Sequence, residues 1–229
     1  MISFFLPIRK GSKRVVNKNF RPLPGYKFGL TEIKINQFIK FKKIVKKKIK
    51  TDFEFVVSTN CKKTLFFLKK YKWINIHLRS DKEAGDDTLD QLIKIVPKIC
   101  KGNYILWTHV TSPFFDHNNY INFINKFINN MNYKSAFSAD LVQKFIYSKK
   151  RGWISHSTKK KKWPRTQDLE KLYVANSSAF IAKREIYEKQ NDRLCNNPLP
   201  IISKKSNSFD LDNYDDFLEL RKSLKKNLI

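Results

Sequence analysis

The feature that most constrains the fold is a regular alternation of short apolar runs with longer amphipathic stretches. Apolar runs at residues 2–8, 53–59, 73–78, 103–109 and 135–139 have the length and composition of buried strands. Between them, residues 30–49, 60–71, 89–99 and 117–131 place apolar side chains near helical spacing. Strands that alternate with helices predict βαβ units, so we expect an α/β fold with a mostly parallel sheet.

The second half of the chain departs from this alternation. Residues 144–165 hold an aromatic, hairpin-like piece, a run of four lysines and the tripeptide WPR. A strand at 172–182, a short helix, a strand at 197–203 and a final helix from about Tyr214 follow. No repeat or low-complexity linker is present, so we expect one domain over residues 1–229, with an excursion over residues 140–171.

The chain is strongly basic, with 47 Lys and Arg against 20 Asp and Glu, a net charge of +27. A nucleic-acid or membrane-surface partner is one explanation. The other is a drift in composition that puts lysines on solvated faces. We favour drift, because the lysines are spread along the whole chain and no compact Arg and aromatic stacking motif accompanies them. No nucleic-acid partner is therefore expected.

The cysteines and the apolar segments bear on the compartment. Cys61, Cys100 and Cys195 are odd in number and far apart, which favours reduced thiols in a cytoplasmic protein. The four histidines show no metal-ligand spacing, which argues against zinc. The apolar start is only seven residues long and charges follow it, so it is neither a signal peptide nor a membrane span.

A basic loop follows the first predicted strand directly. It contains Arg9, Lys10, Gly11, Ser12, Lys13, Arg14 and Lys18. In open α/β sheets, ligands bind outside the carboxyl ends of the strands, where cations and free backbone N–H groups can hold a polyphosphate. Taken alone, however, such a stretch is more often a solvated basic loop.

Two acids near the end of the chain form a candidate metal site. If SFDLD is extended, Asp210 and Asp212 point to the same face, and two carboxylates with phosphate oxygens suit Mg²⁺. The alternative is a surface turn in which Asp212 or Asn213 caps the next helix.

Other polar groups allow a functional or a structural interpretation. Thr111 and Ser112, with His109 just before them, end a strand and could hold a sugar or phosphate, or simply terminate the strand. Arg165 and Gln167 could clamp a carboxylate or belong to an ordinary loop. Arg79 and Asp87 flank an acidic loop. No nucleophile triad, Walker loop or dinucleotide fingerprint is present, so an enzyme built on this chain would work by positioning and charge neutralisation.

Taken in order, these motifs resemble the acylneuraminate cytidylyltransferase family, the CMP-sialic acid synthetases. The resemblance covers residues 2 to about 220 and rests on these segments: PIRKGSKRVVNKN, VSTN, LRSDKEAGDDT, THVTSPF, SAFSA, WPRTQDLEKLYVANSSAFIA and SFDLDNYDDFLEL. It implies a three-layer α/β/α nucleotide-diphospho-sugar transferase fold, which is Rossmann-like, with the excursion used in contact between the two chains of a homodimer.

The resemblance also implies a reaction and a set of site residues. The anomeric hydroxyl of a sialic-acid-like nonulosonate attacks the α-phosphate of CTP, and pyrophosphate leaves with Mg²⁺ assisting. Arg9, Lys13, Lys18 and Asp212 would serve catalysis. The nucleotide would contact Arg9, Ser12, Lys13, Lys18, Asn19, Arg79 and Asp87. The sugar would contact His109, Thr111, Ser112, Arg165, Gln167 and Asn176. The metal would be held by Asp210 and Asp212. Lys10 and Arg14 would belong to the general excess of basic residues.

Several positions depart from the family pattern. Asn17 stands where Gly is usual, and because Asn tolerates positive φ we expect the turn to survive. Asn60 replaces a common Asp. His109 stands where Gln is frequent, and Ser177 replaces a common Gly. The last two lie on the sugar side, which keeps Kdo or another sugar acid open as the substrate. A basic nucleic-acid-binding α/β domain is the alternative from another functional class.

Overall fold

The computed structural model describes residues 1–80, 83 and 89–226. Its centre is a seven-stranded sheet in the order β3-β2-β1-β4-β8-β5-β9. The strands are β1 (Ile2–Ile8), β2 (Phe53–Thr59), β3 (Ile74–Leu78), β4 (Tyr104–Thr108), β5 (Ser135–Val142), β8 (Leu172–Lys183) and β9 (Leu199–Ile202). All neighbouring pairs are parallel except the two that β8 makes with β4 and β5. The prediction of a mostly parallel sheet is confirmed.

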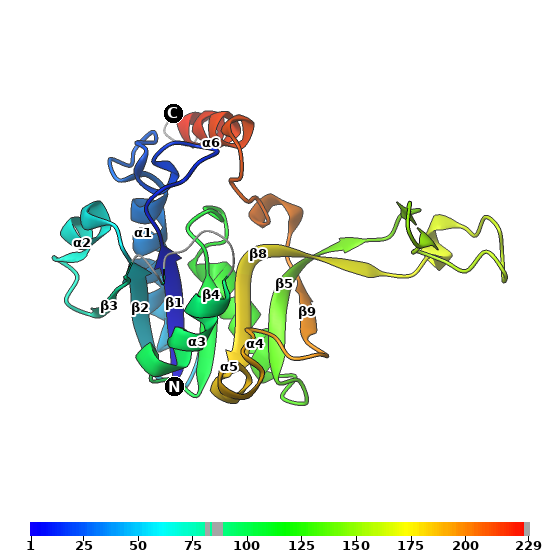
Figure 1. The fold of residues 1–229 in the computed structure, drawn as a ribbon, viewed down its shortest axis with the longest axis horizontal. Helices are drawn as coiled ribbons and strands as arrows, with labels where there is room; N and C mark the ends of the chain where they lie inside the picture. Colours follow the sequence, from blue (N-terminus) through cyan, green and yellow to red (C-terminus); the bar gives the residue numbers. More distant parts are fainter. Residues whose placement is uncertain (81–82, 84–88, 227–229) are drawn as a thin grey trace.

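Helices cover both faces of this sheet (Figure 1). They are α1 (Gly29–Val45), α2 (Lys62–Leu68), α3 (Asp90–Ile99), α4 (His117–Ile128), α5 (Arg184–Gln190) and α6 (Tyr214–Lys226). One buried cluster joins the sheet to α1 and α4, and a second joins it to α3 and α5. The predicted three-layer α/β/α fold is therefore confirmed.

The central strand β1 shows how the sequence builds two cores. Successive side chains of a strand point to opposite faces, and Phe4 and Phe5, both fully buried, belong to different clusters. Phe4 packs in edge-to-face geometry against Phe38 of α1 and Tyr120 of α4, at ring-centroid distances of 5.3 and 5.4 Å. Burial of a side chain of this size contributes about 1.5–3 kcal/mol, so the continuous apolar run fixes β1 in the middle of the sheet.

The strand order creates a switch point beside β1. The chain runs outward from β1 through β2 to β3, and then returns to place β4 on the other side of β1. In open α/β sheets the crevice at such a reversal, outside the carboxyl ends of the strands, is where ligands bind. The loops after β1 and β4 are therefore where a ligand is expected to bind.

Asp116 positions the second of these loops. Its side chain accepts hydrogen bonds from the backbone N–H groups of Asn118 and Asn119 at the start of α4, both at 3.0 Å. Asp116 is therefore the N-cap of α4. Because α4 begins there, the segment after β4 has only a few residues in which to turn, and it stays close to the end of β1.

The predicted excursion is present. Beyond the sheet, β5 and β8 continue as an antiparallel ribbon that Figure 1 shows projecting away from the other strands. It carries a small hairpin, β6 (Tyr147–Ser148) with β7 (Gly152–Trp153). Phe145, Trp153 and Trp163 pack together there, with ring centroids 5.4–6.0 Å apart. Across the part of the chain that the structure describes, no helix has the length and apolar character needed to cross a membrane.

Candidate functional site

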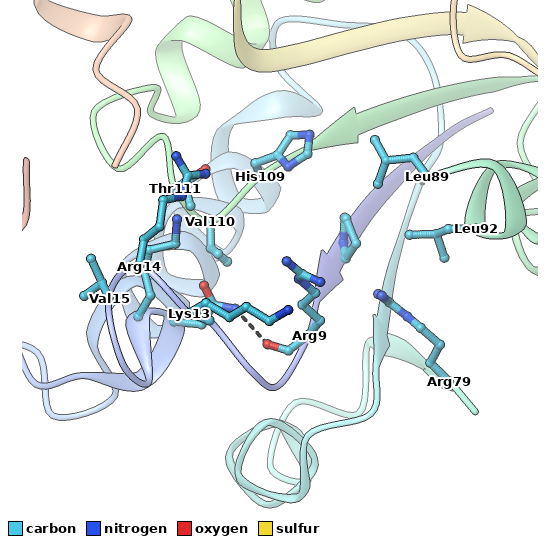
Figure 2. A pocket seen from close by; sticks show the side chains of 14 residues that line it. Arg9, Lys13, Arg14, Val15, Arg79, Leu89, Leu92, His109, Val110 and Thr111 are labelled. Atoms are coloured by element: carbon cyan, nitrogen blue, oxygen red, sulfur yellow. Dashed lines mark hydrogen bonds between the residues drawn. The ribbon is translucent and has the colours of Figure 1, made fainter. Parts of the chain in front are cut away.

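A pocket of about 470 Å³ opens at the switch point between β1 and β4 (Figure 2). Its walls come from the end of β1 and the loop that follows it, from the residue after β3, from the start of α3 and from the loop after β4. The lining residues are Pro7, Arg9, Ser12, Lys13, Arg14, Val15, Lys18, Asn19, Arg79, Leu89, Leu92, His109, Val110 and Thr111.

The loop after β1 is folded back on itself by its own backbone. Asn17 has φ of +55°, in the left-handed region where Gly and Asn are favoured, and it leads into a short 3₁₀ turn, η1 (Lys18–Phe20). The Asn19 amide donates to the carbonyl of Arg9 at 3.0 Å, which closes the loop (Figure 2). The expectation that Asn17 preserves the family's turn is confirmed, and Asn19 has a structural part in holding the cations in place.

The loop brings its cations to one side of the pocket. Arg9, Lys13 and Lys18 all line it, together with Ser12. Arg14 lines it too, and its guanidinium pairs with the Asp212 carboxylate at 3.0 Å. The assignment of Arg14 to the general basic excess was therefore wrong. No local pattern separates Arg14 from Lys10, since only the folded loop decides which of the two faces the pocket.

Arg79 provides a further, fixed cation. It is 6% exposed, and its guanidinium donates to the carbonyl of Ser58 at 2.8 Å and to the Ser58 hydroxyl at 3.2 Å. Burial, together with the nearby charge of Arg9, lowers the pKa of Arg79 to about 10. Arg79 is still cationic at neutral pH, so with Arg9 and Arg14 three guanidinium groups line a pocket that suits an anion.

The acidic segment docks on the opposite wall. The backbone N–H of Leu211 donates to the carbonyl of Thr111 at 2.8 Å, and the Lys18 ammonium donates to the carbonyl of Leu211 at 2.7 Å. Residues some two hundred positions apart in sequence are thereby joined at the end of β4. Asp210 and Asp212 each raise the pKa of Lys18 by their charge, although burial has the larger effect and lowers it.

Of the two conformations considered for this segment, the extended one is wrong. Residues 209–213 form no strand. Asn213 caps α6 by accepting from the N–H of Asp216, and the Asp216 carboxylate accepts from the N–H groups of Asp212 and Asn213. The capping alternative is thus confirmed for Asn213. Asp212 itself is exposed, and what brings it near Asp210 is this turn and not a shared strand face.

Asp210 is the unusual member of the pair. Its Oδ1 atom is buried and has no hydrogen-bond partner among the described residues. Burial raises the pKa of Asp210, and this outweighs the opposing effects of the Thr111 hydrogen bond and the Lys18 charge. A buried carboxylate oxygen without a donor is costly unless a cation reaches it, so this atom marks a position where the donor set suits a metal ion.

His109 forms the wall above β4. The indole N–H of Trp107 donates to its Nε2 at 3.1 Å, and Arg193 approaches the same atom at 3.4 Å. Burial, followed by the charge of Arg193, lowers the pKa of His109 to about 3. His109 is therefore neutral at physiological pH.

Six of the predicted site residues that the structure describes do not line the pocket: Ser112, Arg165, Gln167, Asn176, Asp210 and Asp212. Ser112 and Asn176 are buried. The carbonyl of Ser112 accepts from Lys34 at 3.0 Å, and Asn176 bonds the side chains of Ser138 and Asp140. Arg165 and Gln167 are exposed on the excursion, where Arg165 pairs with Asp168 at 3.0 Å. Asp87 lies outside the described residues.

Two cations close to the site were not identified from the sequence. Lys34 of α1 is fully buried and donates to Ser112, Phe115 and Tyr120, which ties the loop after β4 to the helix. Arg193 lies beneath His109. Lys34 looked like one of many lysines in a basic helix. Its position on the apolar face of the helix, between Ile33 and Ile35, was the available hint.

Comparison with solved structures reproduces this arrangement of strands. The 4-diphosphocytidyl-2C-methyl-D-erythritol synthase from Anaerococcus prevotii is similar at a TM-score of 0.67 and 15% identity, with 98% of each chain covered. A CMP:2-keto-3-deoxy-manno-octonic acid synthetase, solved in complex with CTP, is similar at a TM-score of 0.62 and 10% identity over 99% of each chain. HddC from Yersinia pseudotuberculosis is similar at 0.56 and 10% identity, with 97% of this chain and 99% of that chain covered.

At these identities the neighbours establish the fold alone. None of the curated proteins compared with the chain matches it. A family model does match, under the description cytidylyltransferase, and it spans residues 4–211. That span runs from the middle of β1 to Leu211, so it includes the basic loop, both pocket walls and the excursion. The chain is a nucleotidyltransferase and belongs to the cytidylyltransferase family.

Proposed function

We propose that the protein transfers CMP from CTP to the anomeric hydroxyl of a sialic-acid-like nonulosonate and releases pyrophosphate. The observation that carries the proposal is the pocket at the β1–β4 switch point. There a loop with several cations lines the pocket, and two of these cations contact the acidic segment beside it: Arg14 pairs with Asp212, and Lys18 donates to the carbonyl of Leu211. The resemblance of the sequence motifs to CMP-sialic acid synthetases supplies the class of acceptor.

The basic loop is suited to the triphosphate. Arg9, Lys13 and Lys18, with the Ser12 hydroxyl, would bind its oxygens and stabilise the charge that develops as pyrophosphate leaves. Arg79 and Asn19 would lie beside the cytidine, with Asp87 near them. Since Arg79 is held by Ser58, it is oriented before the nucleotide arrives.

Asp210 and Asp212 fit a magnesium ion. Their oxygens are the hard ligands that Mg²⁺ prefers, and the buried Oδ1 of Asp210 lacks another partner among the described residues. The described residues hold no cluster of three or more His, Cys, Asp and Glu side chains that would bind a metal by itself, so phosphate oxygens and water would complete the coordination. When bound, the ion would neutralise negative charge on the phosphates.

The acceptor would lie against His109 and Thr111, which are the sugar-side residues that line the pocket. Ser112 and Asn176 lie behind this wall. Arg165 and Gln167 are on the excursion, so we propose that they reach the pocket of a second copy of the chain, in a homodimer that the excursion holds together. This places a sugar-binding arginine of one chain opposite the carboxylates of the other.

Mixing two inactive variants tests this arrangement. Arg165→Ala and Asp212→Ala should each lack turnover, and their random mixture should recover about a quarter of wild-type activity, because half of the dimers are mixed and each has one intact site. Arg151, an exposed arginine elsewhere on the excursion, provides the control, since Arg151→Ala should stay active alone. No recovery on mixing would place Arg165 outside the partner's site.

The identity of the acceptor has a second candidate, Kdo. The CTP-bound neighbour is a synthetase for that sugar acid, and the two departures from the sialic acid pattern, His109 and Ser177, lie on the sugar side. The reaction chemistry is the same for both acids. We propose a cytoplasmic setting for either reaction, with which the three free cysteines, Cys61, Cys100 and Cys195, are compatible.

A panel assay separates the acceptors. Pyrophosphate release should be measured with CTP, Mg²⁺ and N-acetylneuraminate, Kdo or 2C-methyl-D-erythritol 4-phosphate, the last because a synthase of its diphosphocytidyl product is a structural neighbour. Release with a nonulosonate supports the proposal. Release with Kdo or the polyol phosphate alone would replace it, and no release from a folded protein would contradict nucleotide transfer to all three.

A further inference from the structure

Arg193 is a largely buried cation that the proposed site does not use. It follows α5, which ends at Asn191 with φ of +50°. Its guanidinium lies over the ring of Phe180, 3.8 Å from the centroid, and 5.5 Å from that of Trp107. Among the described residues no salt bridge includes Arg193. The Arg193 guanidinium therefore packs against two aromatic rings, and it also lies 3.4 Å from Nε2 of His109.

The contacts of His109 fix where its proton is. Trp107 and Arg193 both point N–H groups at Nε2, at 3.1 and 3.4 Å. An indole N–H and a guanidinium can donate but not accept. Nε2 must then be the unprotonated nitrogen, and a neutral imidazole carries its hydrogen on the other one, Nδ1. Nδ1 has no hydrogen-bond partner among the described residues, and His109 lines the pocket.

We propose that Arg193 is a positioning residue for His109. Together with Trp107 it fixes His109 as the Nδ1–H form, so that His109 is a neutral hydrogen-bond donor to an oxygen of the acceptor sugar. The inference rests on the proposed function for the identity of the acceptor, but the state of His109 does not depend on it.

The surroundings of His109 favour this role over acid–base chemistry. Three cations act on the ring, namely Arg193, Lys34 and Lys18, and each lowers the pKa of His109. A histidine that stays neutral cannot supply a proton by titrating near pH 7. It can donate one directed hydrogen bond, and a hydroxyl or carboxylate oxygen accepts such a bond. A frequent Gln at this position in the sialic acid synthetases would also donate through its side chain, without Arg193 being needed.

Nitrogen NMR of ¹⁵N-histidine-labelled protein tests the state of His109 without any substrate. His109→Gln identifies its signals among the four histidines. We expect an unprotonated Nε2 and a protonated Nδ1 in the wild type, unchanged from pH 5 to 8. In Arg193→Met we expect a higher pKa for His109 and an admixture of the Nε2–H form. Lys189→Met, which removes an exposed cation of α5, is the control and should leave the His109 signals unchanged.

Kinetics test the role in binding. Loss of one neutral hydrogen bond corresponds to about a 3- to 10-fold weaker interaction, so Arg193→Met should raise KM for the sugar acid by that factor, with kcat and KM for CTP near wild type. Arg193→Lys keeps the charge without the planar stack and guards against a variant that fails to fold; it should give a smaller rise.

Three results would overturn the inference. One is a wild-type His109 with its proton on Nε2. Another is an Arg193→Met protein whose His109 signals and sugar KM both match the wild type. The third is a changed spectrum with an unchanged KM, which would remove His109 from sugar recognition. If no acceptor supports turnover, the proposed function fails, while the NMR experiment still decides whether Arg193 sets the state of His109.

Discussion

Replacing Asp210 by Asn should make the ligand-free protein more stable and the enzyme nearly inactive. The Asp210 carboxylate is held near the end of β4 with a buried Oδ1 that has no donor among the described residues. Its pKa is raised even though Lys18 and Thr111 lie close by, so its ionised form is disfavoured in the folded state. An amide of the same shape removes the charge and keeps the packing.

The expected stabilisation follows from this burial. A buried polar atom without a partner costs about 1–3 kcal/mol, and because the amide does not satisfy the site fully we expect a gain of about 1 kcal/mol. For a chain of this length that corresponds to a Tm about 2–4 °C higher. Turnover should fall by about 10²–10³-fold, the usual loss when one electrostatic group of a transition-state site is removed.

The stabilisation expected for Asp210→Asn should also depend on pH. A carboxyl whose pKa is raised in the folded state destabilises the protein above that pKa, and this destabilisation vanishes as the pH falls below the unfolded value of 3.8. The Tm difference between Asp210→Asn and wild type should therefore be largest near pH 7 and shrink toward pH 4.

Differential scanning fluorimetry and the pyrophosphate assay measure the two effects. The melts should be recorded without Mg²⁺ and CTP, and then with both, when the wild type should gain stability and Asp210→Asn should gain less. Asp215→Asn, an exposed acid in the first turn of α6, is the matched control and should keep full activity. A ligand-free Asp210→Asn protein that is less stable than the wild type would contradict the cost assigned to the buried carboxylate. Normal turnover of this variant would contradict its part in the reaction.

The remaining predictions concern a buried lysine, the turn and the net charge. Burial lowers the pKa of Lys34 to about 7, so between pH 7 and 8.5 the unfolded state binds more protons and stability should rise, by at most about 1.4 kcal/mol per pH unit from this group; denaturant melts of wild type and Lys34→Met should differ in slope, and parallel profiles would contradict the assignment. Asn17→Gly should keep wild-type stability, whereas Asn17→Val should lose about 1–2 kcal/mol because of its positive φ and should bind CTP more weakly by calorimetry; equal stability of the two variants would count against the turn. Duplex DNA should bind weakly at physiological salt, and tight binding that falls steeply with added salt would revive a nucleic-acid partner for the +27 charge.

The architecture was predictable because the local signals agreed. The apolar run of β1 and the break before the excursion each depend on neighbours in sequence, and each was found as expected. The alternation of strands and helices then left few topologies. The antiparallel placement of β8 had no local signal, since a strand's direction is decided by the connection that precedes it.

The site was predictable where the motif resemblance reached it and was missed where burial decided. Arg9 and Lys18 were placed by the motif, but Arg14 could not be separated from Lys10 until the loop folded. The sequence left the Asp210 segment open between an extended form, which alternating acids suggest, and a capping turn, and the α6 cap imposes the turn. Arg193 contacts aromatic faces that belong to two different strands, β4 and β8, a contact that no sequence window contains.

In the proposed reaction, this pocket joins CMP to an acid sugar. Phosphorus NMR of the protein with CTP, Mg²⁺ and the acceptor panel tests the reaction directly, because it follows the bonds that break and form. We expect the β- and γ-phosphorus signals of CTP to convert to pyrophosphate while the α-phosphorus appears as a phosphodiester, only when a nonulosonate is present, and we expect Asp212→Ala to abolish this conversion. Release of orthophosphate without a phosphodiester, or intact CTP with every acceptor, would contradict it.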